Sequence, residues 1–164
     1  PLFEILNSEA GKQKERLEEL LAGLKEGDIR RGQAVFYSQK AACVACHAIG
    51  YLGGNTGPDL TRIGNIRTER DLLESIVFPS ISFVRSYEPV TIITTTGKVH
   101  NGLIRLETTD DITLATGPKE EVRIPRADIE ELRPSALSIM PAGLEQQITR
   151  QQLADLIAFL RNAK

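Results

Sequence analysis

Residues 41–50, "AACVACHAIG", contain both cysteines of this 164-residue chain and one of its two histidines. Cys43 and Cys46 are three positions apart, and His47 directly follows the second of them. Three kinds of site use a Cys-x-x-Cys pair: a structural zinc site, a redox-active dithiol and an attachment point for haem c. The residues around the pair distinguish these three chemistries.

The histidine directly after Cys46 favours haem attachment. Two thiols at this spacing can reach both vinyl groups of one porphyrin, and His47 can then bind the iron from the same side. A zinc site would need His100 as its fourth ligand, and the adjacent Cys46 and His47 fit one tetrahedron poorly. A thioredoxin-like pair follows a strand, whereas residues 26–40 predict an amphipathic helix. We therefore expect one haem c per chain, covalently bound through Cys43 and Cys46, with the dithiol and zinc as alternatives.

The composition indicates a folded, water-soluble chain, with 41% hydrophobic and 26% charged residues. The 20 Lys and Arg residues are outnumbered by 22 Asp and Glu, so the net charge of -2 gives no reason to expect nucleic-acid binding. No apolar run reaches the roughly 18 residues of a membrane span. The charged start of the chain is unlike a signal peptide. Since haem c is attached outside the cytoplasm, we expect a periplasmic or otherwise exported bacterial protein whose signal sequence is not in this chain.

Apolar residues at helical spacing predict four helices. The first covers residues 3–25 and is either a leader that packs on the domain or a helix that binds a partner. The other three helices start at residues with capping side chains, namely Asp28, Thr68 and Thr149. Gly32, inside the second helix, costs up to about 1 kcal/mol of helix stability unless another backbone comes close to it.

Residues 86–133 change to a period of two, rich in Val, Ile and Thr and interrupted by turn residues. This pattern predicts four or five short antiparallel strands. They are expected at residues 88–96, 99–107, 111–116, 120–125 and 128–132. A sheet this small must curl or cover its edges, so we expect a small SH3-like or Sm-like barrel.

Three segments together resemble a class I c-type cytochrome domain: "GQAVFYSQKAACVACHAIG" (32–50), "GNTGPDLTRIG" (54–64) and "SIMPAGLEQQITRQQLADLIAFLRN" (138–162). With its strand-rich insert, the arrangement is similar to the haem-binding domain of the Planctomycete and Verrucomicrobial type. That domain often ends large proteins that carry a dehydrogenase-like propeller. The resemblance implies a mainly α fold. The implied parts are a leader helix (1–27), a cytochrome c-like helical haem domain (28–85 and 134–164) and a small β-rich insert (86–133) before the distal-ligand loop.

The same resemblance implies roles for single residues. It makes the two cysteines the thioether anchors and His47 the proximal iron ligand. In the segment from Gly57 to Leu60, the carbonyl of Pro58 would accept a hydrogen bond from the ring of His47 and orient it, as outer-shell partners do for metal-bound histidines. Leu60 would lie at the haem edge. An ordinary turn is the alternative interpretation of Gly57 and Pro58.

Met140 is the only methionine, and we expect it to be the sixth ligand of the iron. Pro141 and Gly143 would stiffen the loop that carries it. A lone methionine usually fills a core, which is the alternative for this residue. His100 is the rival ligand, but "TGKVHNG" predicts that it lies exposed at a hairpin turn.

These ligands predict a mono-haem c-type cytochrome that transfers single electrons and is not an enzyme. Two strong axial ligands exclude a substrate from the iron, and a thioether favours ferrous iron. The expected partners are a dehydrogenase, separate or fused, as electron donor and a respiratory acceptor. One alternative is a haem-based sensor or small haem enzyme with an exchangeable sixth ligand. Another is a docking module in which the strands have the main role.

Overall fold

The structure is a computed structural model that describes the fold of residues 2–164 and the side-chain environments of residues 8–164. The helices are α1 (Leu2–Ala22), α2 (Ile29–Phe36), α3 (Cys43–Cys46), α4 (Glu69–Val77), α5 (Leu144–Gln147) and α6 (Arg150–Arg161), with 3-10 turns η1 (Ile63–Asn65) and η2 (Arg126–Asp128). The strands are β1 (Ala48–Ile49), β2 (Leu52–Gly53), β3 (Val90–Thr94), β4 (Val99–Glu107), β5 (Asp111–Gly117), β6 (Glu120–Pro125) and β7 (Ile129–Pro134).

The chain forms two compact units. Unit 1 comprises Pro1–Ala42, Thr61–Phe78 and Ala142–Lys164, and unit 2 comprises Cys43–Leu60 and Pro79–Pro141. These units divide the chain at places other than the predicted domain boundaries, which stay a prediction.

The protein is mixed α/β, and the prediction of a mainly α fold is wrong. Helices hold 37% of the residues and strands 24%, with a five-stranded antiparallel sheet. The prediction treated residues 86–133 as a minor insert in a helical domain. In the structure five strands lie between Val90 and Pro134 and form this one sheet.

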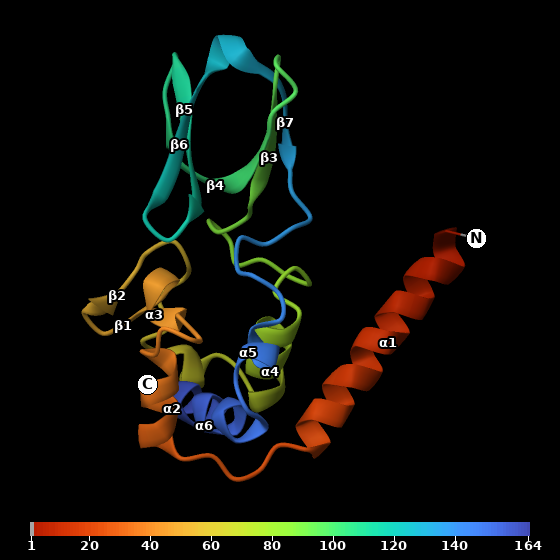
Figure 1. The fold of residues 1–164 in the computed structure, drawn as a ribbon, viewed down its shortest axis with the longest axis vertical. Helices are drawn as coiled ribbons and strands as arrows, with labels where there is room; N and C mark the ends of the chain where they lie inside the picture. Colours follow the sequence, from red (N-terminus) through yellow and green to blue (C-terminus); the bar gives the residue numbers. More distant parts are fainter. Residues whose placement is uncertain (1) are drawn as a thin grey trace. The chain divides into compact units, whose positions relative to one another are not determined.

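In unit 1, α2 crosses α6 at close range, as Figure 1 shows near the bottom of the view. A Cβ atom on Gly32 would lie 1.9 Å from the backbone oxygen of Asp155, so only glycine allows this approach. Another backbone therefore does come close to Gly32. The rings of Phe36 and Phe159 meet next to it with 5.7 Å between their centroids.

A buried carboxylate joins the same two helices. Asp155 is 2% exposed and accepts hydrogen bonds from the backbone N–H of Asp28 at 2.8 Å and from Nε and Nη2 of Arg31 at 2.8 and 2.9 Å. Gln151 donates a further bond at 3.0 Å. The Arg31 guanidinium, helped by these donors, lowers the pKa of Asp155 from 3.8 to about 2. Because its acceptors are satisfied, this buried charge is tolerated.

The predicted helix starts are confirmed. Asp28 caps α2 by accepting from the N–H of Arg31, and Thr68 and Thr149 each begin a helix with a reciprocal capping box. α1 ends at Ala22, three residues before the predicted end. Its Leu17 and Leu20 are buried, and Glu18 pairs with Arg70 of α4 at 2.6 Å. No helix in residues 2–164, α1 included, combines the length and apolar character needed to cross a membrane.

In unit 2, β3 to β7 lie within two residues of the predicted strands. The strand order is β6-β5-β4-β3-β7, and every neighbouring pair is antiparallel. The sheet curls along β4 so that β3 and β7 face β5 and β6 (Figure 1). The core between them contains four buried residues: Ile92, Ile112, Leu114 and Ile124. β6 and β7 are the outer strands in this order, and the small SH3-like or Sm-like barrel stays a prediction.

Candidate functional site

The cysteine motif forms a single helical turn, α3, closed by a hydrogen bond of 2.9 Å from the N–H of His47 to the oxygen of Cys43. Cys43 and Cys46 are half-buried and are not joined in a disulfide. Burial raises the pKa of Cys43 to about 11 and also raises that of Cys46. Redox-active dithiols have a lowered thiol pKa, so this turn lacks the activation that such chemistry needs.

The three side chains of the motif do not converge on one point. Within residues 8–164, no group of three or more His, Cys, Asp or Glu side chains is arranged to hold a metal ion. A structural zinc site needs four converging ligands. The arrangement of Cys43, Cys46 and His47 is thus unlike that of a zinc site.

The chain after the motif folds back on the α3 turn. β1 and β2 form a short hairpin, in which Ala48 pairs with Gly53. Three backbone N–H groups of the following loop then donate to oxygens of the motif region at 2.8 Å each. These bonds run from Gly54 to Val44, from Gly57 to Cys46 and from Leu60 to Ala48. The loop of residues 53–60, called the proximal loop below, is therefore fixed to the motif along its whole length.

His47 is held in one tautomer by this loop. Its Nδ1 lies 2.8 Å from the carbonyl oxygen of Pro58. A carbonyl can only accept, so Nδ1 carries the hydrogen and the lone pair of Nε2 is left to bind a ligand. Burial lowers the pKa of His47, outweighing the opposing effect of the Pro58 bond, so the ring is neutral at neutral pH. A neutral, oriented imidazole is the form in which histidine binds metals.

Gly57 makes room for this ring. A Cβ atom built on Gly57 would lie 2.5 Å from Cε1 and 2.7 Å from Nδ1 of His47. No side chain fits at these distances, so the backbone of the buried Gly57 forms a wall against which the imidazole rests. The predicted site residues Gly57, Pro58 and Leu60 thus all lie in the loop that packs on the motif.

Met140 lies in the loop between β7 and α5, half-buried. Its N–H donates to Oγ of Ser138 at 3.1 Å, and the N–H of Ser138 donates to Oγ of Ser80 at 3.0 Å. Unit 2 contains Met140 together with all six other predicted site residues, which lie within Cys43–Leu60. His100 is in strand β4, paired with Ile92, so its predicted place at a hairpin turn is wrong.

Sequence reasoning missed two polar residues of β4 that contact the loops of the site. Nη2 of Arg105 donates to the backbone oxygen of Asn55 at 2.8 Å and to its Oδ1 at 3.0 Å. Nδ2 of Asn101 donates to the backbone oxygen of Leu137 at 3.1 Å. The residues that these bonds join are 50 and 36 positions apart along the chain, so no local pattern could have indicated them.

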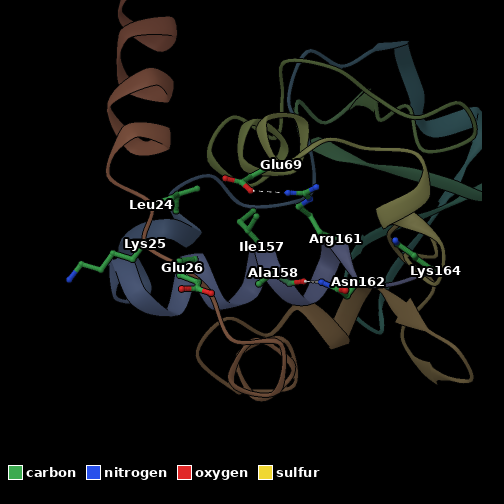
Figure 2. Close-up of a pocket in the computed structure, with 11 residues that line it drawn as sticks. Leu24, Lys25, Glu26, Glu69, Ile157, Ala158, Arg161, Asn162 and Lys164 are labelled. Carbon is green, nitrogen blue, oxygen red and sulfur yellow. Dashed lines mark hydrogen bonds and ion pairs between the residues drawn. The ribbon is translucent and has the colours of Figure 1, made fainter.

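A separate cavity of about 410 Å³ lies in unit 1, between residues 24–27 and α6 (Figure 2). Arg161 on its wall pairs with Glu69 at 3.2 Å, and Nδ2 of Asn162 donates to the oxygen of Ala158 at 2.8 Å. None of the predicted site residues lines it. These two polar side chains of the wall are thus already paired.

The donor set of the α3 turn fits covalently bound haem better than the two alternatives. Two thiols stand on one turn, and the next residue offers a neutral imidazole with Nε2 available and Nδ1 fixed by a carbonyl. These are the groups that c-type attachment and a proximal histidine require.

No model of a known protein family matches this chain, and neither does any curated protein.

Proposed function

We propose that this chain is a mono-haem c-type cytochrome that carries single electrons. Cys43 and Cys46 would hold one haem through thioether bonds, and His47 and Met140 would be the axial ligands of its iron. The observation that carries the proposal is the hydrogen bond of 2.8 Å between Nδ1 of His47 and Pro58, next to the Cys-x-x-Cys turn. This bond leaves the lone pair of Nε2 available to bind iron. The chemistry of a redox-active dithiol does not require it.

Each residue of the site would have its own role in binding the haem or in setting its reduction potential. Haem iron, when bound, supplies the chemistry of taking up and releasing one electron. Partial burial lowers the pKa of His47 and favours its neutral form, and Pro58 keeps its ring from turning. This hydrogen bond also raises the basicity of the imidazole. Met140 would supply a thioether, which favours ferrous iron and leaves no place for a substrate. The proposed role is therefore electron transfer without catalysis.

The proposed setting follows from the same chemistry. Haem c is attached outside the cytoplasm, so the protein would work in the periplasm or another exported location of a bacterium. A dehydrogenase, separate or in the same polypeptide, would donate the electrons, and a respiratory protein would accept them.

The choice of the sixth ligand tests this function. The ferric protein should show the weak long-wavelength band of sulfur-to-iron charge transfer, and the reduced protein should bind carbon monoxide poorly at neutral pH. Met140→Ala should abolish the band, increase carbon monoxide binding and lower the reduction potential, since a water or nitrogen ligand favours ferric iron more than a thioether does. His100→Ala is the control and should change none of these properties.

Two outcomes would contradict the proposal. A silent Met140→Ala, with His100→Ala opening the iron to carbon monoxide, would indicate a protein with two histidine ligands. Ready binding of carbon monoxide by the unmutated protein would show an open sixth site, and would favour the sensor or small haem enzyme.

A further inference from the structure

Strand β4 is hydrogen-bonded to the proximal loop, which orients His47 through Pro58, and to the loop that carries Met140. Arg105 holds Asn55, which lies three residues before Pro58, the partner of His47. Asn101 holds Leu137, which lies three residues before Met140. The loop of residues 135–141, called the distal loop below, and the proximal loop thus share one support, within unit 2.

We propose that β4 positions both axial ligands of the iron, with Arg105 acting on the His47 side and Asn101 on the Met140 side. The inference rests on the proposed function and deepens it. It gives the strands a part in setting the reduction potential and in closing the sixth site. Each residue acts through the loop that it binds, so each is a positioning residue.

The backbone of β4 is shaped to present Arg105. The pairing of β4 with β5 runs regularly from Leu103 to Ile104 and shifts between Ile104 and Leu106, so Arg105 is the extra residue of a β-bulge. Bulges turn a side chain away from the regular alternation and occur often beside functional sites. The bulge thus accounts for a long, exposed arginine that reaches a loop outside the sheet.

The orientation of Asn101 is also fixed from the sheet. Asn101 pairs with Thr91 of β3, and the hydroxyl of Thr91 donates to its Oδ1 at 3.4 Å. This leaves Nδ2 to donate to Leu137. β4 lies at the centre of the strand order, with β3 on one side and β5 on the other, so the support is firmer than an edge strand would be.

The proximal side is tested by Arg105→Gln in the haem-loaded protein. A looser proximal loop should weaken the bond from His47 to Pro58, make the imidazole less basic and raise the reduction potential. Amide hydrogen exchange at Gly57 and Leu60 should become faster. Arg105→Lys keeps a donor, so its reduction potential and its amide exchange rates should lie between those of Arg105→Gln and the unmutated protein. Arg133→Gln, at an exposed arginine of β7, is the control and should resemble the unmutated protein.

The distal side is tested by Asn101→Asp, which keeps the shape of the side chain and removes the donor to Leu137. The ferric charge-transfer band should weaken, and the carbon monoxide affinity of the reduced protein should rise, because a distal loop no longer tied to β4 holds the Met140 sulfur less firmly. Thr91→Val removes only the weak bond behind Asn101, and should have a much smaller effect.

The inference is overturned if Arg105→Gln and Asn101→Asp leave the potential, the band, carbon monoxide affinity and loop exchange equal to those of their controls. If the unmutated protein carries covalent haem and shows the band, that result removes the inference alone. An unmutated protein that attaches no haem, shown by a pyridine haemochrome assay, removes the proposed function and the inference together.

Discussion

Gly57 and His47 illustrate how single residues shape the site. The wall formed by Gly57 and the carbonyl of Pro58 restrain the ring from two directions, so its orientation is set before any ligand binds. Such preorganisation lowers the cost of binding, because the ring does not have to be ordered at that moment.

Gly57→Ala should therefore disturb the site directly. Its Cβ would lie 2.5 Å from Cε1 of His47, so the ring or the proximal loop must shift and the bond to Pro58 should break. We expect the fraction of chains that carry haem, measured by the haemochrome assay, to fall.

The control for this change is Gly11→Ala in α1. Nothing lies within 4 Å of a Cβ at Gly11, and alanine favours a helix over glycine by about 1 kcal/mol. Haem content should stay unchanged in this variant. A Gly57→Ala protein with full haem content and an unaltered spectrum would show that the close approach has no part in holding the ring.

The crossing of α2 and α6 is the main feature at the scale of elements. Asp155→Asn should lower the free energy of unfolding by more than the roughly 0.5 kcal/mol that is typical of a surface change, because Arg31 loses its buried charged partner. The folded-state pKa of Asp155, about 2, lies below its ordinary 3.8. Its charge thus stabilises the fold fully only above about pH 4, and this stability is lost as pH falls through about 2.

Urea unfolding of both proteins between about pH 7 and pH 2 would measure this effect. The gap in stability between the unmutated protein and Asp155→Asn should be largest at neutral pH and should shrink as the solution is acidified. Glu131→Gln, at an exposed pair with Arg133 in β7, is the control and should differ little at any pH. A gap that stays constant down to pH 2 would show that the charge of Asp155 does not stabilise the crossing.

Some elements could be predicted because their signals are local. The caps at Asp28, Thr68 and Thr149 depend on residues within one turn, and the alternation of strands depends on neighbours. The burial of Asp155 could not be predicted, since a carboxylate between apolar residues of α6 looks like a solvent-facing position. Its partner Arg31 is 124 residues away in the chain.

At the scale of the whole molecule, the mainly α fold was predicted from a resemblance rather than from the residues alone. That resemblance treated the strands as a minor insert, whereas they form a five-stranded sheet in the same compact unit as the cysteine motif. The bond from His47 to Pro58, which the resemblance implied, is present at 2.8 Å. The support of both loops by β4 depends on tertiary pairing and has no counterpart in the sequence pattern.

The whole account depends on one haem that is covalently attached to Cys43 and Cys46. Intact-mass spectrometry under denaturing conditions tests this most directly, on protein made in a host that attaches haem to exported chains and then extracted with acid-acetone. The account predicts a single species with the mass of the chain plus one haem and no free thiol, and predicts that Cys43→Ser with Cys46→Ser has the mass of the bare chain. An unmutated protein with the mass of the bare chain, with two free thiols and with haem absent or fully extracted, would contradict it.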